Sequence, residues 1–464
     1  MERLKKVIRE LSDKDFTQIK SALEKKESKK FLSVLVSYRG ENVTEEKIRT
    51  SIKCSKGAYY VLKSRLLDKI QDLLVKKSKV PKTTSLTGYL YDSPRETAIS
   101  TLHQLEKNCI DNDIPQELIN VLSVLKKAHF YSDKYFHYSQ LYNKQIAYTL
   151  ALEKAEELLF NFNKTLANYF FSRSSTDKEI ISFLLKEMKN IYSLNQSHRF
   201  ELIKNFMLIQ CQLFTDIALH DEDHTEDLIE TCEQITNNYP NDPQSKYYNL
   251  VVSYFWLEYY CTINQPKKII YYFEIVNKQS QTWLLYNNYC LSFKFLYTKL
   301  HVFSSLNKMK ELKNEEKEIY FDKYDFYTQS TLKFQEAIID MYCGSLQESI
   351  NILRGLIDGI TLHHFCHFEI EIKLTLAYLY IKQNNTEMAD MLLKNLSRKI
   401  NTTRKADYLN ALQFTKILTL LMNKGKTKVT KNKTQQAIQQ FNYCNTGERK
   451  ILSFLQPAIE QEYK

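Results

Sequence analysis

The sequence has few of the residues that most often make turns, with 8 glycines and 7 prolines among 464 residues. Average proteins contain roughly 7% glycine and 5% proline, several times more than this chain. A doubly wound α/β fold, a β-sandwich or a phosphate-cradling enzyme needs more turn residues than these. Hydrophobic residues still make up 43% of the chain, which is ample for a packed core. The composition therefore predicts an all-α protein.

Long hydrophobic runs are also missing. No stretch of 18 apolar residues occurs, and Ser253 and Glu258 interrupt the most apolar segment, residues 251–261. The opening Met-Glu-Arg-Leu-Lys-Lys lacks the apolar core of a signal peptide. The nine cysteines include no pair three residues apart, which fits neither a disulfide framework nor a zinc ribbon. We expect a soluble protein of the reducing cytoplasm, without a membrane span.

Charge is distributed unevenly along the chain. Residues 1–82 contain 22 Lys and Arg against 11 Asp and Glu, so they carry the whole net charge of +11. Residues 77–85 combine proline, hydroxyl side chains and no large apolar run, as linkers do. We therefore predict a basic helical module over residues 1–76, with DNA or another polyanion as a possible partner of residues 1–82.

Within the basic module, Thr44 is placed to cap a helix over residues 45–52, and Ser55 to cap a longer one. Two helices joined by residues 53–55 could form a helix-turn-helix, whose second helix enters the major groove. The residues that would contact phosphates are Lys53, Lys56, Lys63 and Arg65. The same helix also carries acidic and neutral residues on its outer face. A solvated helical cap is therefore the simpler interpretation, and contact with nucleic acid the alternative.

Beyond the linker, the chain falls into helix pairs whose first members start 36 to 41 residues apart. Two helices in each unit of this length predict a superhelical array in which every pair buries its face on the next. The predicted helices span residues 245–262 and 266–278, 281–303 and 304–317, 320–343 and 345–358, and 361–383 and 385–399. Residues 86–240 continue as helices with a weaker pattern.

Two of these pairs place large, small, aromatic, small and large residues at one spacing. The two motifs are Leu376-Ala377-x2-Tyr380-x8-Ala389-x3-Leu393 and Trp256-Leu257-x2-Tyr260-x8-Ile269-x3-Phe273, the second with bulkier residues at the small positions. This spacing resembles the tetratricopeptide repeat. The resemblance implies a right-handed superhelical array of antiparallel helix pairs, TPR-like over residues 241–464 with a C-terminal capping helix and divergent over residues 86–240. It also implies a groove that binds a peptide or protein.

The start of the chain shows a second likeness. Residues 11–16, 29–32 and 59–64 resemble the opening of uncharacterised bacterial proteins that carry tetratricopeptide repeats. This resemblance implies no activity. It leaves a non-enzymatic protein-protein interaction scaffold as the expected function. The alternative is a transcriptional or nucleic-acid-associated regulator, with the basic module on DNA and the repeats as sensor.

Ten aromatic residues cluster between positions 247 and 273. Most of them occupy packing positions of the repeat and are expected in the core. Tyr248, Tyr259 and Tyr271 could instead reach the groove and bind a partner, because tyrosine is common among the residues that dominate binding interfaces.

Two patterns raise the possibility of a metal or a catalytic site. His363, Cys366 and His367 lie at i, i+3 and i+4, so three ligands could share one helix face. Residues 368–374 alternate apolar and charged as a strand does, and Glu371 and Lys373 with an upstream Asp358 resemble the carboxylate-lysine pair of metal-dependent nucleases. No HExxH or CxxC accompanies the histidines, and no sheet is expected nearby. A plain helix is the favoured interpretation, with no cofactor and no catalytic residue.

Overall fold

The structure is a computed structural model whose described residues form two compact units. The units are Met1–Leu150 with Asn241–Pro243, and Ala151–Pro240 with Gln244–Lys464. The described residues are 3–11, 13–26, 29–40, 44–77, 86–92, 94–217, 224–287, 289–316, 326–359, 364–403, 407–422, 428–446, 450–455 and 458–459. The predicted linker, residues 77–85, lies outside them except for Lys77, the last residue of α5.

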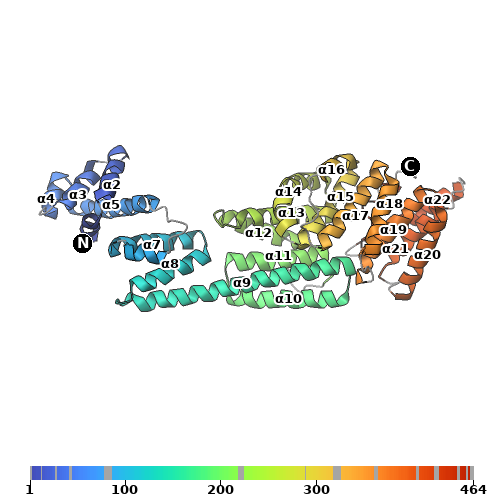
Figure 1. Cartoon of the computed structure of the whole chain (residues 1–464), viewed down its shortest axis with the longest axis horizontal. Coiled ribbons are helices and arrows are strands. Elements are labelled where there is room, and N and C mark those ends of the chain that lie inside the picture. The colour runs from blue at the N-terminus through green and yellow to red at the C-terminus, as the bar shows by residue number, and fades with distance from the viewer. Residues whose placement is uncertain are drawn as a thin grey trace. The chain divides into compact units, whose positions relative to one another are not determined.

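Helices are the regular elements throughout the described residues, which contain no strand (Figure 1). The predicted all-α class is confirmed. The first unit contains α1 (Arg3–Glu10), α2 (Asp13–Lys26), α3 (Lys29–Arg39), α4 (Glu45–Ser51), α5 (Lys56–Lys77), α6 (Leu86–Asp92), α7 (Arg95–Asp111) and α8 (Pro115–Ala128). The division between the units falls within α9 (Lys134–Ser172). None of the described helices is long and apolar enough to cross a membrane.

The second unit continues from the end of α9 through the remaining helices. They are α10 (Ser175–Leu194), α11 (His198–Phe214), α12 (Thr225–Asn238), α13 (Ser245–Thr262), α14 (Pro266–Asn287), α15 (Tyr289–Ser305), α16 (Met309–Glu316), α17 (Phe326–Cys343), α18 (Leu346–Gly359), α19 (Cys366–Lys382), α20 (Thr386–Thr403), α21 (Leu409–Met422) and α22 (Lys428–Cys444). From α10 to α22, each helix packs against the next one along the chain. Contacts also join α11 to α13, α15 to α17 and α19 to α21.

Most of the predicted helix bounds hold within a few residues, and α13 matches the predicted 245–262. One predicted break is wrong. The helix that begins at Pro266 was expected to end at residue 278, but α14 runs on to Asn287, and α15 starts at Tyr289 instead of residue 281. The residues around Ser280 include neither glycine nor proline, so nothing local stops the helix.

One turn geometry recurs where paired helices meet. After α13, α15, α17 and α19, a single residue adopts a positive φ: Asn264, Asn307, Gly344 and Asn384. At each turn, the next residue donates its backbone N–H to a carbonyl five positions earlier, as in Asn385 N to Tyr380 O at 2.8 Å and Lys308 N to Phe303 O at 2.9 Å. This is the Schellman helix ending, which favours glycine or asparagine at the left-handed position. Asparagine therefore replaces the scarce glycine at three of these four turns.

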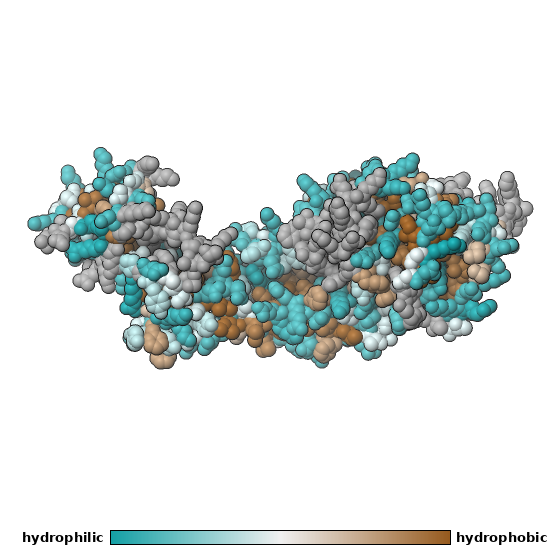
Figure 2. Space-filling model, in the orientation of Figure 1, coloured by the Kyte–Doolittle hydropathy of each residue, from teal (hydrophilic) through white to brown (hydrophobic). Residues whose placement is uncertain are grey.

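The repeat-like positions lie in the core between paired helices. Ala377 of α19 and Ala389 of α20 are fully buried, and Tyr380 and Leu393 nearly so. Small side chains at facing positions let two helices approach closely, while the larger neighbours fill the remaining space. Phe160 of α9 and Phe183 of α10 are exposed. Figure 2 shows that hydrophobic side chains reach the surface in several places.

The N-terminal helices share a separate hydrophobic cluster that includes Val7, Leu35 and Leu66. Ser55 caps α5 as predicted, because its hydroxyl accepts the N–H of Ala58 at 3.3 Å. Thr44 stands at the N-cap position of α4, but its side chain makes no capping hydrogen bond. The predicted cap at Thr44 is therefore wrong in its chemistry, although the helix starts where expected.

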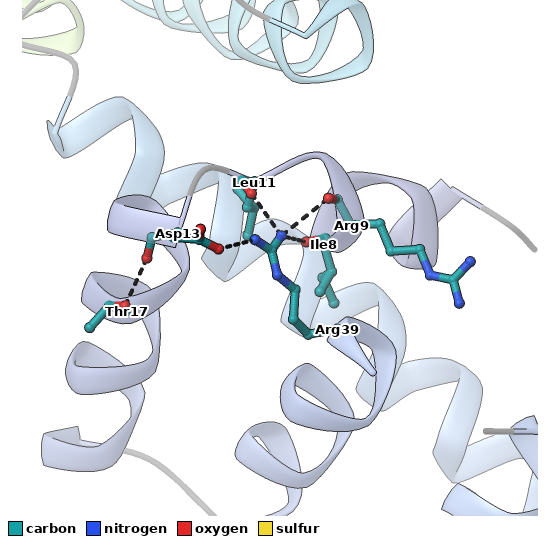
Figure 3. Close-up of polar contacts among 6 residues, drawn as sticks. All are labelled: Ile8, Arg9, Leu11, Asp13, Thr17 and Arg39. Atoms are coloured by element: carbon teal, nitrogen blue, oxygen red, sulfur yellow. Dashed lines mark hydrogen bonds and ion pairs between the residues drawn. The ribbon is translucent and has the colours of Figure 1, made fainter. Parts of the chain in front are cut away.

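Arg39 joins the end of α3 to the end of α1 (Figure 3). Its guanidinium donates to the carbonyl oxygens of Ile8, Arg9 and Leu11 at 3.0, 3.1 and 2.7 Å, and to Asp13 Oδ1 at 2.6 Å. The last carbonyls of a helix lack intrahelical partners and carry partial negative charge. One arginine therefore satisfies several orphan acceptors and holds α1 against the module.

We expect Arg39→Ala to destabilise α1 by about 2 kcal/mol, because charged hydrogen bonds to a helix end are lost together. Arg39→Lys keeps the charge but not the planar fork, and should lose part of this stability. Amide hydrogen exchange over residues 3–10 of the full chain measures the effect. The control is Arg49→Ala, whose pair with Glu46 spans 3.8 Å at the surface. Unchanged exchange in Arg39→Ala would contradict this role.

Candidate functional site

A chamber of about 500 Å³ lies within the second unit. Its wall comes from the end of α9, from α11, α13, α15 and α19, and from a non-helical stretch after α22. We call this stretch the C-terminal segment, residues 445–446 and 450–455 among those described. The charged residues of the chamber wall are Arg173, Glu258, Lys294, Glu371 and Lys450.

A buried carboxylate on α13 organises one side of the chamber. Glu258 is only 4% exposed, and it accepts a hydrogen bond from Lys294 Nζ at 3.0 Å and another from the Thr298 hydroxyl. Lys294 also lies over the ring of Phe214, with Nζ 5.4 Å from its centroid. A buried charge needs a partner to offset its lost hydration. Glu258 and Lys294 therefore fix each other in the wall between α13 and α15.

Glu371 of α19 binds the C-terminal segment. Its Oε1 accepts the backbone N–H of Leu452 at 2.9 Å, and its Oε2 accepts the Tyr297 hydroxyl at 3.2 Å. Burial raises the pKa of Glu371 from 4.5 to about 7, because a carboxylate loses its hydration there, although both hydrogen bonds oppose this shift. Burial and the neighbouring Glu371 likewise hold the pKa of Tyr297 well above its usual value, so Tyr297 stays a donor.

Further contacts hold the C-terminal segment against the helices. The Asn445 side chain accepts the N–H of Ile451 and donates to its carbonyl, both at 2.8 Å. The Tyr342 hydroxyl of α17 donates to the Phe454 carbonyl at 2.5 Å, and the Phe454 ring lies edge-on to Phe334. Ile451, Leu452, Phe454 and Leu455 are each at most 1% exposed.

The backbone of the segment takes an unusual conformation at Leu452. This residue has a φ of 56°, in the left-handed region that branched side chains rarely adopt. Such a conformation costs about 1–2 kcal/mol and persists only where the surroundings hold it. Burial of its side chain and the hydrogen bond to Glu371 supply that restraint.

Other charged groups of the chamber are positioned by aromatic rings or affected by burial. Arg173 is 6% exposed, and its guanidinium lies 4.8 Å from the centroid of the Phe170 ring. Burial and the neighbouring Lys294 lower the pKa of Lys450. Burial and nearby lysines lower the pKa of His301 to about 4, so the ring is neutral at pH 7. Burial raises the pKa of the Cys261 thiol to about 12, which keeps it protonated and a poor nucleophile.

The predicted partner-binding tyrosines do not line this chamber. Tyr248 is 5% exposed, and its hydroxyl donates to Gln244, the residue just before α13, so it belongs to the core. Tyr259 is half-buried and donates to Glu226 Oε2 of α12 at 2.8 Å. Tyr271 is 58% exposed on α14. The structure does not bring the three together as one surface of this cavity.

The histidine-cysteine cluster is placed only in part. His363 lies outside the described residues, Cys366 begins α19, and His367 is buried and lines the chamber. Within the described part of the chain, Cys366 and His367 belong to no group of three ligand atoms within 4.8 Å of one another.

The strand-like alternation of residues 368–374 belongs to a helix, as expected, because α19 spans all of them. The nuclease-like pair is separated. Lys373 bonds Glu369 at 2.5 Å, whereas Glu371 bonds Leu452 and Tyr297. A carboxylate and a lysine two residues apart point to different faces of a helix, so they cannot act on one metal ion together.

Of the four predicted phosphate-contacting residues, Lys53, Lys56 and Arg65 are exposed. Lys63 is 7% exposed, with its ammonium 2.8 Å from Glu45 Oε1 and over the ring of Tyr60. Its ammonium group therefore forms an ion pair between α4 and α5 within the module. Nucleic-acid binding by the remaining three stays a prediction.

Sequence reasoning missed most of the chamber because its residues are far apart along the chain, from Arg173 to Lys450. The one usable signal was Glu258, a charged residue in the most apolar stretch of the sequence. A carboxylate in such a stretch is buried only with a partner, so it marks a polar site. Nothing local identifies Lys294 as its partner.

No protein-family model, curated protein or solved structure matches this chain. The geometry of the chamber and of the C-terminal segment therefore bears most directly on its function. The chamber is lined by buried carboxylates, cations and hydroxyl groups, and the main chain of the C-terminal segment is bound beside it.

The raised pKa of Glu371 predicts a pH dependence of stability. The ionised form is disfavoured in the folded state. The contribution of Glu371 to the free energy of unfolding is therefore fully present below about pH 4.5 and is lost as the pH rises through about 7. Glu371→Gln keeps the shape of the neutral acid. Between pH 4.5 and 8, the wild type should lose about 3 kcal/mol of unfolding free energy relative to Glu371→Gln.

Denaturant unfolding followed by tryptophan fluorescence measures this difference, since both tryptophans, Trp256 and Trp283, belong to the second unit. Glu387→Gln, at an exposed glutamate of α20, is the matched control and should follow the wild type. If the free energy of unfolding depends on pH in the same way for the wild type and Glu371→Gln, the carboxyl is not buried as described.

Proposed function

We propose that the second unit is a helical-repeat scaffold that binds a peptide segment of a protein partner in the groove where its own C-terminal segment lies. The helix pairs would form a TPR-like, right-handed superhelical array, and α13, α15, α17 and α19 would line its inner face. The protein would act by binding, without catalysis.

The recurring turns support the repeat architecture. Asn264, Asn307, Gly344 and Asn384 follow one another about every 40 residues, each with the same helix ending, which is the period of a two-helix repeat. Repeats that each bury a face on the next one produce an extended surface along the inner helices. The lining of such a surface can vary without disturbing the core between the repeats.

The observation that carries the proposal is how the C-terminal segment is bound. Glu371 accepts a main-chain N–H, and Tyr342 donates to a main-chain carbonyl. Main-chain contacts of this kind accept many sequences, while pockets for buried side chains provide selectivity. Here Ile451, Leu452 and Phe454 fill such pockets.

The C-terminal segment thus stands where a partner's segment would bind, and competes with it. Intramolecular binding has a high effective concentration, so a partner binds only if it matches these contacts better or if the segment is released. The aliphatic and aromatic pockets favour a partner with two adjacent large aliphatic residues and an aromatic residue two positions later, as in Ile451, Leu452 and Phe454.

Phe454→Ala should open the groove to a peptide supplied in trans. Removal of a buried phenylalanine weakens docking by about 3 kcal/mol or more, because the ring contacts with Phe334 are lost. A labelled peptide with the sequence of residues 445–459 should then bind the variant at least about tenfold more tightly than it binds the wild-type chain. Fluorescence anisotropy measures the binding.

The matched control is Tyr443→Ala, at a tyrosine that is 86% exposed just before the segment, and it should behave as the wild type. A scrambled peptide tests sequence selectivity. Tryptophan fluorescence confirms that the second unit of each variant is folded. If folded Phe454→Ala binds the peptide no better than the wild type does, the groove is not a peptide site.

A further inference from the structure

We infer that the chamber of the second unit binds a small polyvalent oxyanion between Lys294, Lys450 and Arg173, with the C-terminal segment as one wall. The ligand would be a phosphate- or carboxylate-bearing small molecule. This site is distinct from the contacts of Ile451, Leu452 and Phe454, and it does not depend on the groove's accepting a partner peptide.

The charges of the wall favour an anion. Arg173, Lys294 and Lys450 line the chamber against two carboxylates, Glu258 and Glu371. Glu258 already bonds Lys294 and the hydroxyl of Thr298. Glu371 already bonds the segment and Tyr297. Within the described residues, no carboxylate forms an ion pair with Lys450.

Two like charges, Lys294 and Lys450, line the same cavity. Lys294 contributes to lowering the pKa of Lys450, which means that the two ammonium groups repel each other across the chamber. An anion between them would remove that repulsion and gain charge-assisted hydrogen bonds from both. Because part of the wall is buried, these interactions are stronger than the same contacts in open water.

Two of the cations are held in place before any ligand arrives. The guanidinium of Arg173 lies on the ring of Phe170, and the ammonium of Lys294 lies over Phe214 while bonded to Glu258. Preorganised donors lose little conformational entropy on binding. Ser453 adds a hydroxyl to the same wall, whereas the hydroxyls of Thr215 and Thr262 already donate to the carbonyls of Cys211 and Tyr259.

The size of the chamber limits the ligand. About 500 Å³ lies within the range of sites that enclose small molecules, roughly 300–1,000 Å³. Asn445, Thr446, Lys450 and Ser453 form part of the wall, so the site is complete only while the C-terminal segment is docked. The anion therefore stabilises the docked state and slows hydrogen exchange of residues 450–455.

Isothermal titration calorimetry of the full chain with pyrophosphate and with citrate tests this inference, at equal ionic strength and with sodium chloride as the monovalent control. We expect saturable binding of at least one polyvalent anion and none of chloride. Tighter binding of pyrophosphate identifies a phosphoryl ligand, and tighter binding of citrate a polycarboxylate.

Lys450→Gln removes one cation from a partly exposed position and should weaken the binding at least about tenfold, whereas Lys450→Arg should retain it. Lys416→Gln, an exposed lysine of α21 outside the chamber wall, has the same change of charge and should bind as the wild type. Absence of saturable binding by both anions, or equal loss in Lys416→Gln, would overturn the inference.

Discussion

The hydrogen bond between the Leu452 amide and the buried carboxyl of Glu371 connects residues 81 positions apart and fixes the C-terminal segment among the helices of the second unit. Around it, Tyr297 bonds the second oxygen of the same carboxyl, and Tyr342 bonds the main chain two residues on. Leu452 adopts a left-handed backbone conformation to reach this position. Both proposals depend on this contact, since it places a segment in the groove and closes the chamber.

Because Glu371 binds the C-terminal segment, the stability of this contact depends on pH. Glu371 is buried enough that its pKa lies near neutrality, so its protonation changes within the physiological range. Ionisation adds a buried negative charge to the wall and weakens the folded state, because the cations Arg173 and Lys294 offset the lost hydration only in part. An anion in the chamber would favour protonated Glu371, because a bound anion and the ionised carboxylate repel each other.

The fold was predictable where the pattern is local. The spacing of apolar residues predicted α13 at its observed bounds, and small residues such as Ala377 and Ala389 identified a closely packed pair. The end of α14 was missed because its sequence lacks a breaker. The helix breaks at residues 263–265 and 384 were predicted, but the left-handed conformation of Asn264, Asn307 and Asn384 was not, because asparagine at that position is a weaker signal than glycine.

The candidate site was mostly unpredictable, for a physical reason. Its charged residues come from five separate places in the chain, and only tertiary packing brings Lys294 beside Glu258 or Glu371 beside Leu452. Glu371 drew notice for its spacing from Lys373, but the helix turns these two side chains to different partners. Tyr248 was predicted to reach a partner-binding groove, but its side chain is buried in the core.

Hydrogen exchange at the single amide of Leu452 in the full chain, near pH 6, tests the central claim most directly. The account predicts an amide protected far beyond that of the free peptide 445–459, with the protection lost in Glu371→Ala. An amide that exchanges as fast in the folded chain as in the free peptide would contradict it, because the segment would then not be bound to Glu371.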